Sequence, residues 1–145
     1  MAASKIFPNQ NETNSVLIIS QDVDMIRVWK ALFEQRNCRV ISETAAREGV
    51  LTSRLLSPTL IILDMDMPDN ERLALCRELR ATTGGTLLLI NSGYKNIDVL
   101  EYHRAGVDEA VDDSISPMAL LVKSLTWLAR QDWIVPRRPS AQLWA

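Results

Sequence analysis

The sequence predicts an α/β fold of the doubly wound type, with five parallel strands in one sheet and five helices over its two faces. Short apolar runs alternate along the chain with segments whose apolar residues recur at helical spacing, and loop-forming residues separate the two kinds of segment. Strict alternation favours a parallel sheet, because right-handed crossovers place helices on both of its faces. A length of 145 residues suits one such domain.

The five predicted strands are of two kinds. Continuous apolar runs at 16–19, 60–63 and 86–90 are typical of strands that are buried on both faces of a parallel sheet. Shorter strands are predicted at 39–42 and 110–111. Asp64 directly follows the second apolar run, which places it at the carboxyl end of a strand.

Five helices are predicted between and after the strands, and several carry an apolar stripe. From Met25 onward the apolar residues follow the i, i+3, i+4, i+7 pattern, and Asn37 is a plausible left-handed stop. Gly106 suits the end of a later helix, and Pro117 suits the first turn of the last one. The other helices are predicted at 45–56, 71–82 and 97–105, and the last at 117–128.

Composition excludes several classes of protein. Sixteen basic and eighteen acidic residues give a net charge of −2, so broad capture of nucleic acid or of an anionic membrane is not expected. No apolar run approaches the ~20 residues that span a bilayer, and the start of the chain lacks the apolar stretch of a signal peptide. The two cysteines, Cys38 and Cys76, show no zinc or disulfide pattern and fit a reducing compartment. We therefore expect a cytoplasmic protein.

The chain divides into three parts by composition. Residues 1–15 form a polar leader, residues 16–130 form the domain, and residues 131–145, with two prolines and no helical periodicity, are predicted to be a tail or linker.

The functional pocket is expected at the carboxyl edge of the sheet, where ligands bind in doubly wound folds. Polar residues follow the strands there. They are Ser20, Gln21, Asp22, Asp64, Asn91, Ser92, Asp112 and Asp113.

Several segments share the register of one known family. The segment LDMDMP at 63–68 looks like a phosphoacceptor segment, in which a strand-end aspartate is followed four residues later by proline. The segments at 73–80 and 105–109 are similar to the third helix of that family and to the turn before its fifth strand, and residues 116–117 stand where its last helix begins. Over residues 15–130 the chain thus resembles the receiver domain of two-component response regulators, which implies a flavodoxin-like fold.

The resemblance implies phosphoryl transfer to an aspartate, with Mg²⁺ held by acids at the end of the first strand, and with a hydroxyl and a lysine on the phosphoryl oxygens. Aligned without gaps, this chain places Asp64 at the phosphoacceptor, and only this position matches. The positions that depart from the family pattern are Ser20 and Gln21 at the acidic pair, Asn91 at the hydroxyl, Asp113 at the lysine, Ser114 at the proline that follows it, and Ala110 at the coupling aromatic.

These departures predict an altered pocket that does not switch by phosphorylation. A carboxylate at Asp113 would repel phosphoryl oxygens by about 3 kcal/mol per charge pair at roughly 5 Å and an effective dielectric constant of about 20. No metal is expected; Asp22 beside Asp64, or Asp66, would have to substitute for the missing ligands. We expect no cofactor and no enzymatic activity, but a signalling module that acts through protein contacts.

An acidic segment at 98–113 predicts where a partner would dock. It holds six acids against Arg104 alone, and the resemblance implies that this region is the contact face for output domains and dimers. The predicted partner face comprises Asp98, Glu101, Asp108, Glu109 and Ala110. A histidine kinase, an output domain, another signalling protein or a second copy are the candidate partners, and a basic partner would be steered to this face.

Alternatives stay open at this point. The acids at 98–113 can equally be a solvated surface, and Asp64 can be a strand-end acid that caps a loop. A conventional receiver would still be phosphorylated on Asp64 by a histidine kinase and would need Mg²⁺. A small flavin-binding or catalytic doubly wound protein is a further alternative, although residues 20–23 offer no phosphate-binding loop.

Overall fold

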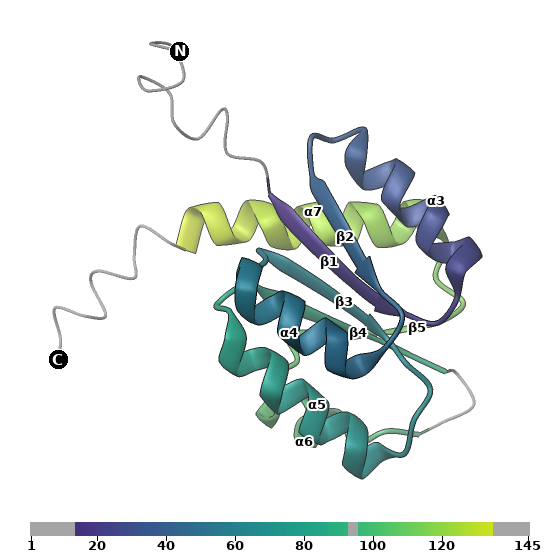
Figure 1. Cartoon of the computed structure of the whole chain (residues 1–145), viewed down its shortest axis with the longest axis vertical. Coiled ribbons are helices and arrows are strands. Elements are labelled where there is room, and N and C mark those ends of the chain that lie inside the picture. The colour runs from purple at the N-terminus through teal and green to yellow at the C-terminus, as the bar shows by residue number, and fades with distance from the viewer. Residues whose placement is uncertain (1–13, 93–95, 135–145) are drawn as a thin grey trace, which may run out of the picture.

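The computed structural model describes residues 14–92 and 96–134, with side chains up to residue 130. Its five strands form one parallel sheet in the order β2-β1-β3-β4-β5 (Figure 1). The strands are β1 Ser15–Ser20, β2 Arg39–Glu43, β3 Leu60–Asp64, β4 Thr86–Asn91 and β5 Glu109–Asp112. The helices are α3 Val23–Glu34, α4 Ala46–Leu56, α5 Asp69–Thr82, α6 Val99–Arg104 and α7 Pro117–Ile134. The predicted fold class is confirmed.

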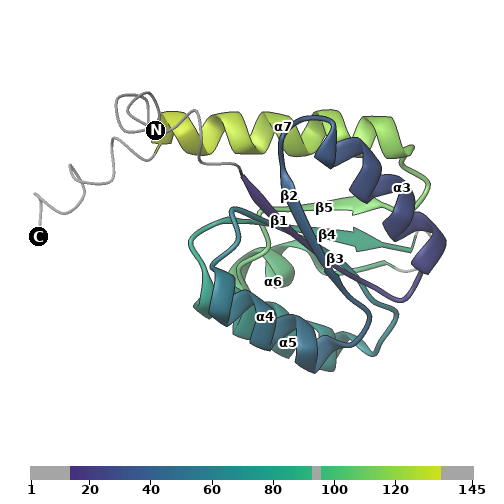
Figure 2. The same cartoon turned by 45° about the horizontal axis from the view of Figure 1, so that its top comes forward.

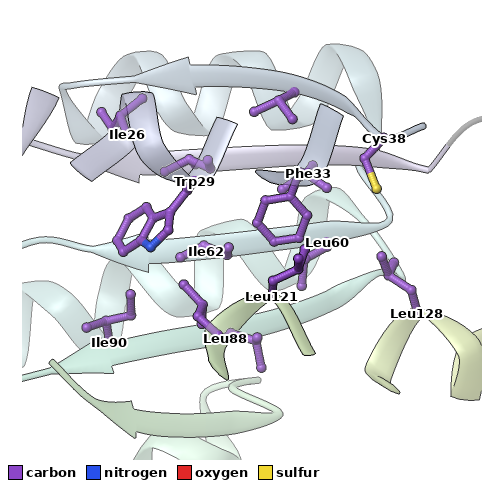
Figure 3. Packing of buried hydrophobic residues seen from close by; sticks show 14 of the residues in the cluster. Ile26, Trp29, Phe33, Cys38, Leu60, Ile62, Leu88, Ile90, Leu121 and Leu128 are labelled. Atoms are coloured by element: carbon purple, nitrogen blue, oxygen red, sulfur yellow. The ribbon is translucent and has the colours of Figure 1, made fainter. Parts of the chain in front are cut away.

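Two apolar layers hold the sheet between the helices. Helices α3 and α7 cover one face, and α4, α5 and α6 cover the other (Figure 2). Successive side chains of a strand point to opposite faces, so Val16 of β1 joins the first layer and Leu17 joins the second. Figure 3 shows the first layer, where Trp29 and Phe33 of α3 and Leu121 of α7 pack on the strands. Each such side chain, once fully buried, contributes about 1.5–3 kcal/mol.

Helix α3 begins where a side chain can cap it. Asp22 has extended backbone angles, and its Oδ1 accepts a hydrogen bond from the Met25 amide at 3.0 Å. The helix therefore begins at Val23 rather than at Met25. The predicted left-handed stop at Asn37 is confirmed by its φ of 63°.

Two predicted helix starts were wrong by two residues. Helix α5 begins at Asp69 rather than at residue 71, directly after Pro68. Helix α6 begins at Val99 rather than at residue 97, because Asp98 caps it by accepting from the Glu101 amide.

The helix ends give one confirmation and one correction. Gly106 follows α6 with a φ of 110°, and a Cβ there would collide with Arg80, so both conformation and space require glycine. Helix α7 continues past residue 130 to Ile134, so the prediction of a tail from residue 131 was wrong at its start. Residues 135–145 and the leader at 1–13 lie outside the described residues.

The sheet register brings the predicted polar residues to one edge. Ser20 pairs with Asp64, and Asn91 pairs with Asp112, at the carboxyl ends of four parallel strands. This edge is where the functional site was expected.

Candidate functional site

A pocket of about 240 Å³ opens at the carboxyl edge of the sheet. Its wall includes Asp64 at the end of β3 and Asp113 after β5, as the sequence predicts. The other lining residues are Met65, Asp66, Arg72, Ile90 and Ser92. Gln21 and Asp22 are exposed and do not line it.

Asp64 is held by a hydroxyl where the family pattern has an acid. The Ser20 side chain, which is fully buried, donates from Oγ to Asp64 Oδ2 at 2.8 Å, and the Asp22 amide donates to the same Oγ at 3.0 Å. Burial raises the pKa of Asp64 above its ordinary value. The Ser20 bond opposes that shift, whereas the charges of Asp22 and Asp113 add to it. The site therefore disfavours the ionised form of the phosphoacceptor candidate.

Asp22 and Asp66 are the two further acids that the sequence analysis considered as metal ligands beside Asp64. The Asp22 carboxylate is occupied in capping α3, and Asp66 is exposed at the pocket rim. Among the residues that the structure describes, no group of three or more His, Cys, Asp or Glu side chains could hold a metal ion. Because Mg²⁺ can be held by one or two carboxylates together with water, the expectation that this pocket holds no metal stays a prediction.

The loop after β5 adds negative charge to the pocket. Asp113 is exposed, and its amide donates to the Asn91 carbonyl at 2.8 Å. Asp112 accepts from the Ser114 amide at 2.8 Å, a bond that lowers the pKa of Asp112 and keeps this acid ionised. The peptide bonds of the described residues are all trans, including the one after Asp113.

Arg72 is the pocket residue that the sequence analysis did not single out. It lies in the first turn of α5, its side chain is only 2% exposed, and it lines the pocket. Its Nε donates to Tyr102 Oη at 2.9 Å, and its Nη2 donates to Asn91 Oδ1 at 3.0 Å and to Asp69 Oδ1 at 3.2 Å. The phenol of Tyr102 in turn donates to Asp69 Oδ1 at 2.8 Å. We call these four side chains the Arg72 cluster.

A signal for Arg72 was present in the sequence. Arg72, Cys76 and Leu79 follow the i, i+4, i+7 spacing of one helix face. Cys76 and Leu79 on that face are both fully buried. An arginine on that stripe needed buried hydrogen-bond partners, but nothing in the sequence indicated which residues they were.

The predicted partner face is less acidic in space than along the chain. Asp108 binds Arg80 Nη1 at 3.1 Å and accepts from the Leu87 amide. Glu109 accepts from Lys123 at 2.7 Å and from the Trp127 indole at 2.8 Å. Asp98 caps α6, Glu101 is exposed and Ala110 is half-buried. Cations from α5 and α7 thus neutralise two of the acids.

A second, shallower groove of about 480 Å³ lies between β5 and α7. Glu109, Lys123 and Trp127 form its polar side, and Arg130 stacks over the Trp127 ring at 4.3 Å from the centroid. Exposed apolar side chains stand beside it, Val122 at 58% and Met118 at 54%.

Comparisons with known proteins agree on one family. Residues 16–124 match the family model described as response regulator receiver domain. The PetR protein of Rhodobacter capsulatus is 32% identical over 110 residues, which cover 74% of this chain and 46% of that protein. A probable transcriptional regulator, ycf27, of Pyropia yezoensis is 23% identical over 86% of this chain and 51% of its own length. The chain spans about half the length of these relatives.

Solved structures show the same fold. A CheY-like receiver domain protein from Methanospirillum hungatei superposes with a TM-score of 0.75 at 22% identity, over 83% of this chain and 98% of that one. The receiver domain of a sensor histidine kinase from Pseudomonas aeruginosa, which holds a magnesium ion in its active site cleft, gives 0.67 at 16% identity, over 81% and 99% of the two chains. These matches do not favour a flavin-binding protein. Within the described segments no helix has the length and apolarity needed to cross a bilayer.

Proposed function

The chain belongs to the response regulator receiver domain family of two-component signalling, and we propose that it is an atypical member that acts through protein contacts without switching by aspartyl phosphorylation. Receiver domains are signalling regulators rather than classical enzymes. They interact with histidine kinases and with output domains.

One observation carries this proposal, namely the hydrogen bond from Ser20 to Asp64 at the position where the family pattern has a metal-binding acid. The hydroxyl satisfies one oxygen of Asp64 without adding the negative charge that would attract Mg²⁺. Burial and the charges of Asp22 and Asp113 raise the pKa of Asp64, which lowers the fraction of this side chain that is in the nucleophilic carboxylate form at a given pH.

A contact surface is available without any change in the pocket. Val122 lines the groove beside Trp127, and Met118 lies one turn earlier on α7; both side chains are exposed. Val99 and Leu100 on α6 are exposed as well. Apolar side chains with a polar rim suit a protein partner. A histidine kinase, an output domain, another signalling protein and a second copy of the chain are the candidates, and the proposal includes a cytoplasmic site of action and no direct contact with nucleic acid or membrane.

The proposal is tested by intact-mass measurement after incubation with acetyl phosphate and MgCl₂. We expect no added phosphoryl group on the wild-type chain. A variant that restores family charges, Gln21→Asp with Asp113→Lys, is expected to gain a partial mass shift, and that shift should be lost when Asp64→Asn is added. A phosphoryl group on the wild-type chain that disappears in Asp64→Asn would contradict the proposal.

A further inference from the structure

The Arg72 cluster joins three elements that are far apart in the sequence. Arg72 and Asp69 come from the first turn of α5, Asn91 from the end of β4, and Tyr102 from the middle of α6. The side chains of Arg72 and Tyr102 are 2% and 1% exposed. One buried guanidinium therefore connects the wall of the Asp64 pocket to α6, a helix outside that pocket.

The hydrogen bonds of the Arg72 guanidinium link the pocket wall to helix α6. Its Nε is bound to Tyr102, and its Nη2 is bound to Asn91 and Asp69. The Arg72 side chain also lines the pocket. Because the guanidinium is planar and rigid, a movement of one nitrogen toward the pocket displaces the others from Tyr102 and Asn91.

It is energetically unfavourable for the buried Arg72 guanidinium to move without its hydrogen-bond partners. A buried cation that loses its partners carries a desolvation penalty of several kcal/mol. Arg72 also lies 5.2 Å from the centroid of the Tyr102 ring, within range of a cation–π contact. The guanidinium and Tyr102 therefore have to move together.

We infer that Arg72 is a positioning residue that couples the Asp64 pocket to helix α6. A ligand in the pocket that attracts the guanidinium breaks the hydrogen bond between Arg72 and Tyr102. Conversely, a partner that shifts α6 moves Arg72 and changes the shape of the pocket wall. The coupling is reciprocal, as linkage requires. It does not depend on whether Asp64 accepts a phosphoryl group.

The test measures a pocket response to a change in α6. Tyr102→Phe removes one hydroxyl from α6 and keeps the ring, and amide chemical shifts of Ser20, Asp64 and Asp113 are recorded by NMR. We expect these resonances to move in the protein that has Arg72. In an Arg72→Met background, where apolar volume replaces the guanidinium, we expect the same Tyr102→Phe change to leave them in place.

Hydrogen exchange gives a second readout. The amides of Tyr102 and Ala105 donate within α6 and its cap, and we expect them to exchange at least tenfold faster in Arg72→Met. If Arg72→Met does not fold, Arg72→Lys replaces it, because lysine keeps the charge but lacks the planar guanidinium. In the Arg72→Lys background, too, we expect Tyr102→Phe to leave the pocket resonances in place.

Arg80 provides the matched control on the same helix. It also bridges elements, through hydrogen bonds to the Gly106 carbonyl and the Asp108 carboxylate, but it does not line the pocket. Arg80→Met should loosen residues 106–108 and leave the pocket response to Tyr102→Phe intact. The inference is overturned if Tyr102→Phe leaves the pocket resonances unmoved in the wild type, or moves them equally with and without Arg72.

Discussion

Asp64 ends β3 and Glu109 begins β5, and these two carboxylates meet opposite electrostatic surroundings. Burial raises the pKa of Asp64, and the nearby acids Asp22 and Asp113 raise it further against the single Ser20 bond. Burial alone would raise the pKa of Glu109 too, but bonds from Lys123 and Trp127 hold it below its ordinary value. Glu109 has a cation at contact distance, whereas among the described residues Asp64 has no ion pair.

The two carboxylates differ because the nearby cations, Arg72 and Lys123, bind different partners. Arg72 is the cation that lines the Asp64 pocket in the described part of the chain, and it donates to Tyr102, Asn91 and Asp69. Lys123, by contrast, directs its ammonium to Glu109. In the described part of the chain Asp64 has no bonded cation, whereas two acids of the predicted partner face, Asp108 and Glu109, have one each. We therefore expect shape and apolar area, and not net charge alone, to select a partner on that face.

The largest effect is expected when the two cations are removed in turn. Arg72→Ala should lower the free energy of unfolding by about 3–5 kcal/mol, because it leaves a cavity and strips buried polar groups of a charged partner. Lys123→Ala should cost about 1 kcal/mol or less, since the Lys123 and Glu109 side chains are 38% and 31% exposed. Urea unfolding at pH 7 measures both. Equal losses would show that burial does not separate the two cations.

A smaller effect of opposite sign is expected from Asp64→Asn. Asparagine keeps an acceptor for Ser20 and removes a charge that burial disfavours, so the variant should be more stable than the wild type at pH 7, by roughly 1 kcal/mol. Because the pKa of Asp64 is raised on folding, the native state binds more protons than the unfolded state between the unfolded and folded pKa values, and wild-type stability falls as pH rises through that window.

The gain from Asp64→Asn should therefore shrink as pH is lowered through the same window and level off once the acid is protonated in both states. Thermal unfolding of the variant and the wild type from pH 3.5 to pH 7 measures this difference in stability. A variant that is less stable than wild type at pH 7 would mean that the Asp64 carboxylate has a cation partner in solution.

The fold was predictable because its determinants are local. Continuous apolar runs mark β1, β3 and β4, and Gly106 marks the end of α6, each by a property of adjacent residues. Helix starts were less accurate, because Asp22 and Asp98 set them by a single side-chain bond that competes with the apolar pattern. The extension of α7 beyond residue 130 was missed, because helix propagation past Leu128 does not need an apolar stripe.

The sequence predicted where the site lies, but it did not predict which charged side chains pair with one another there. Alignment with the family pattern brought Asp64, Asn91 and Asp113 to one edge, and the register of the sheet explains why. Arg72 and Tyr102 are thirty positions apart and meet only through the packing of α5 against α6. Counting acids over 98–113 could not reveal that Arg80 and Lys123, from outside that segment, neutralise two of them.

The smallest change in stability is expected from Glu109→Gln, which tests the other carboxylate of the comparison. Glu109→Gln keeps an acceptor for Trp127 and loses the charge that Lys123 binds, so it should be less stable than wild type at pH 7, by about 0.5–1 kcal/mol. Because the pKa of Glu109 is lowered on folding, its stabilising contribution exists above the unfolded pKa and is lost as pH falls through the folded one. The pH dependence is thus the reverse of that for Asp64.

Salt separates this effect from a packing defect. At 1 M NaCl the Debye length is about 3 Å, so a half-exposed ion pair should lose most of its contribution, and the difference between Glu109→Gln and wild type should nearly vanish. The Asp64→Asn gain should persist at the same salt, because it reflects burial of a charge rather than attraction between charges. Urea unfolding at 0.05 M and 1 M NaCl compares the two variants directly. If both differences respond to salt alike, the two carboxylates share one electrostatic environment and the contrast between them fails.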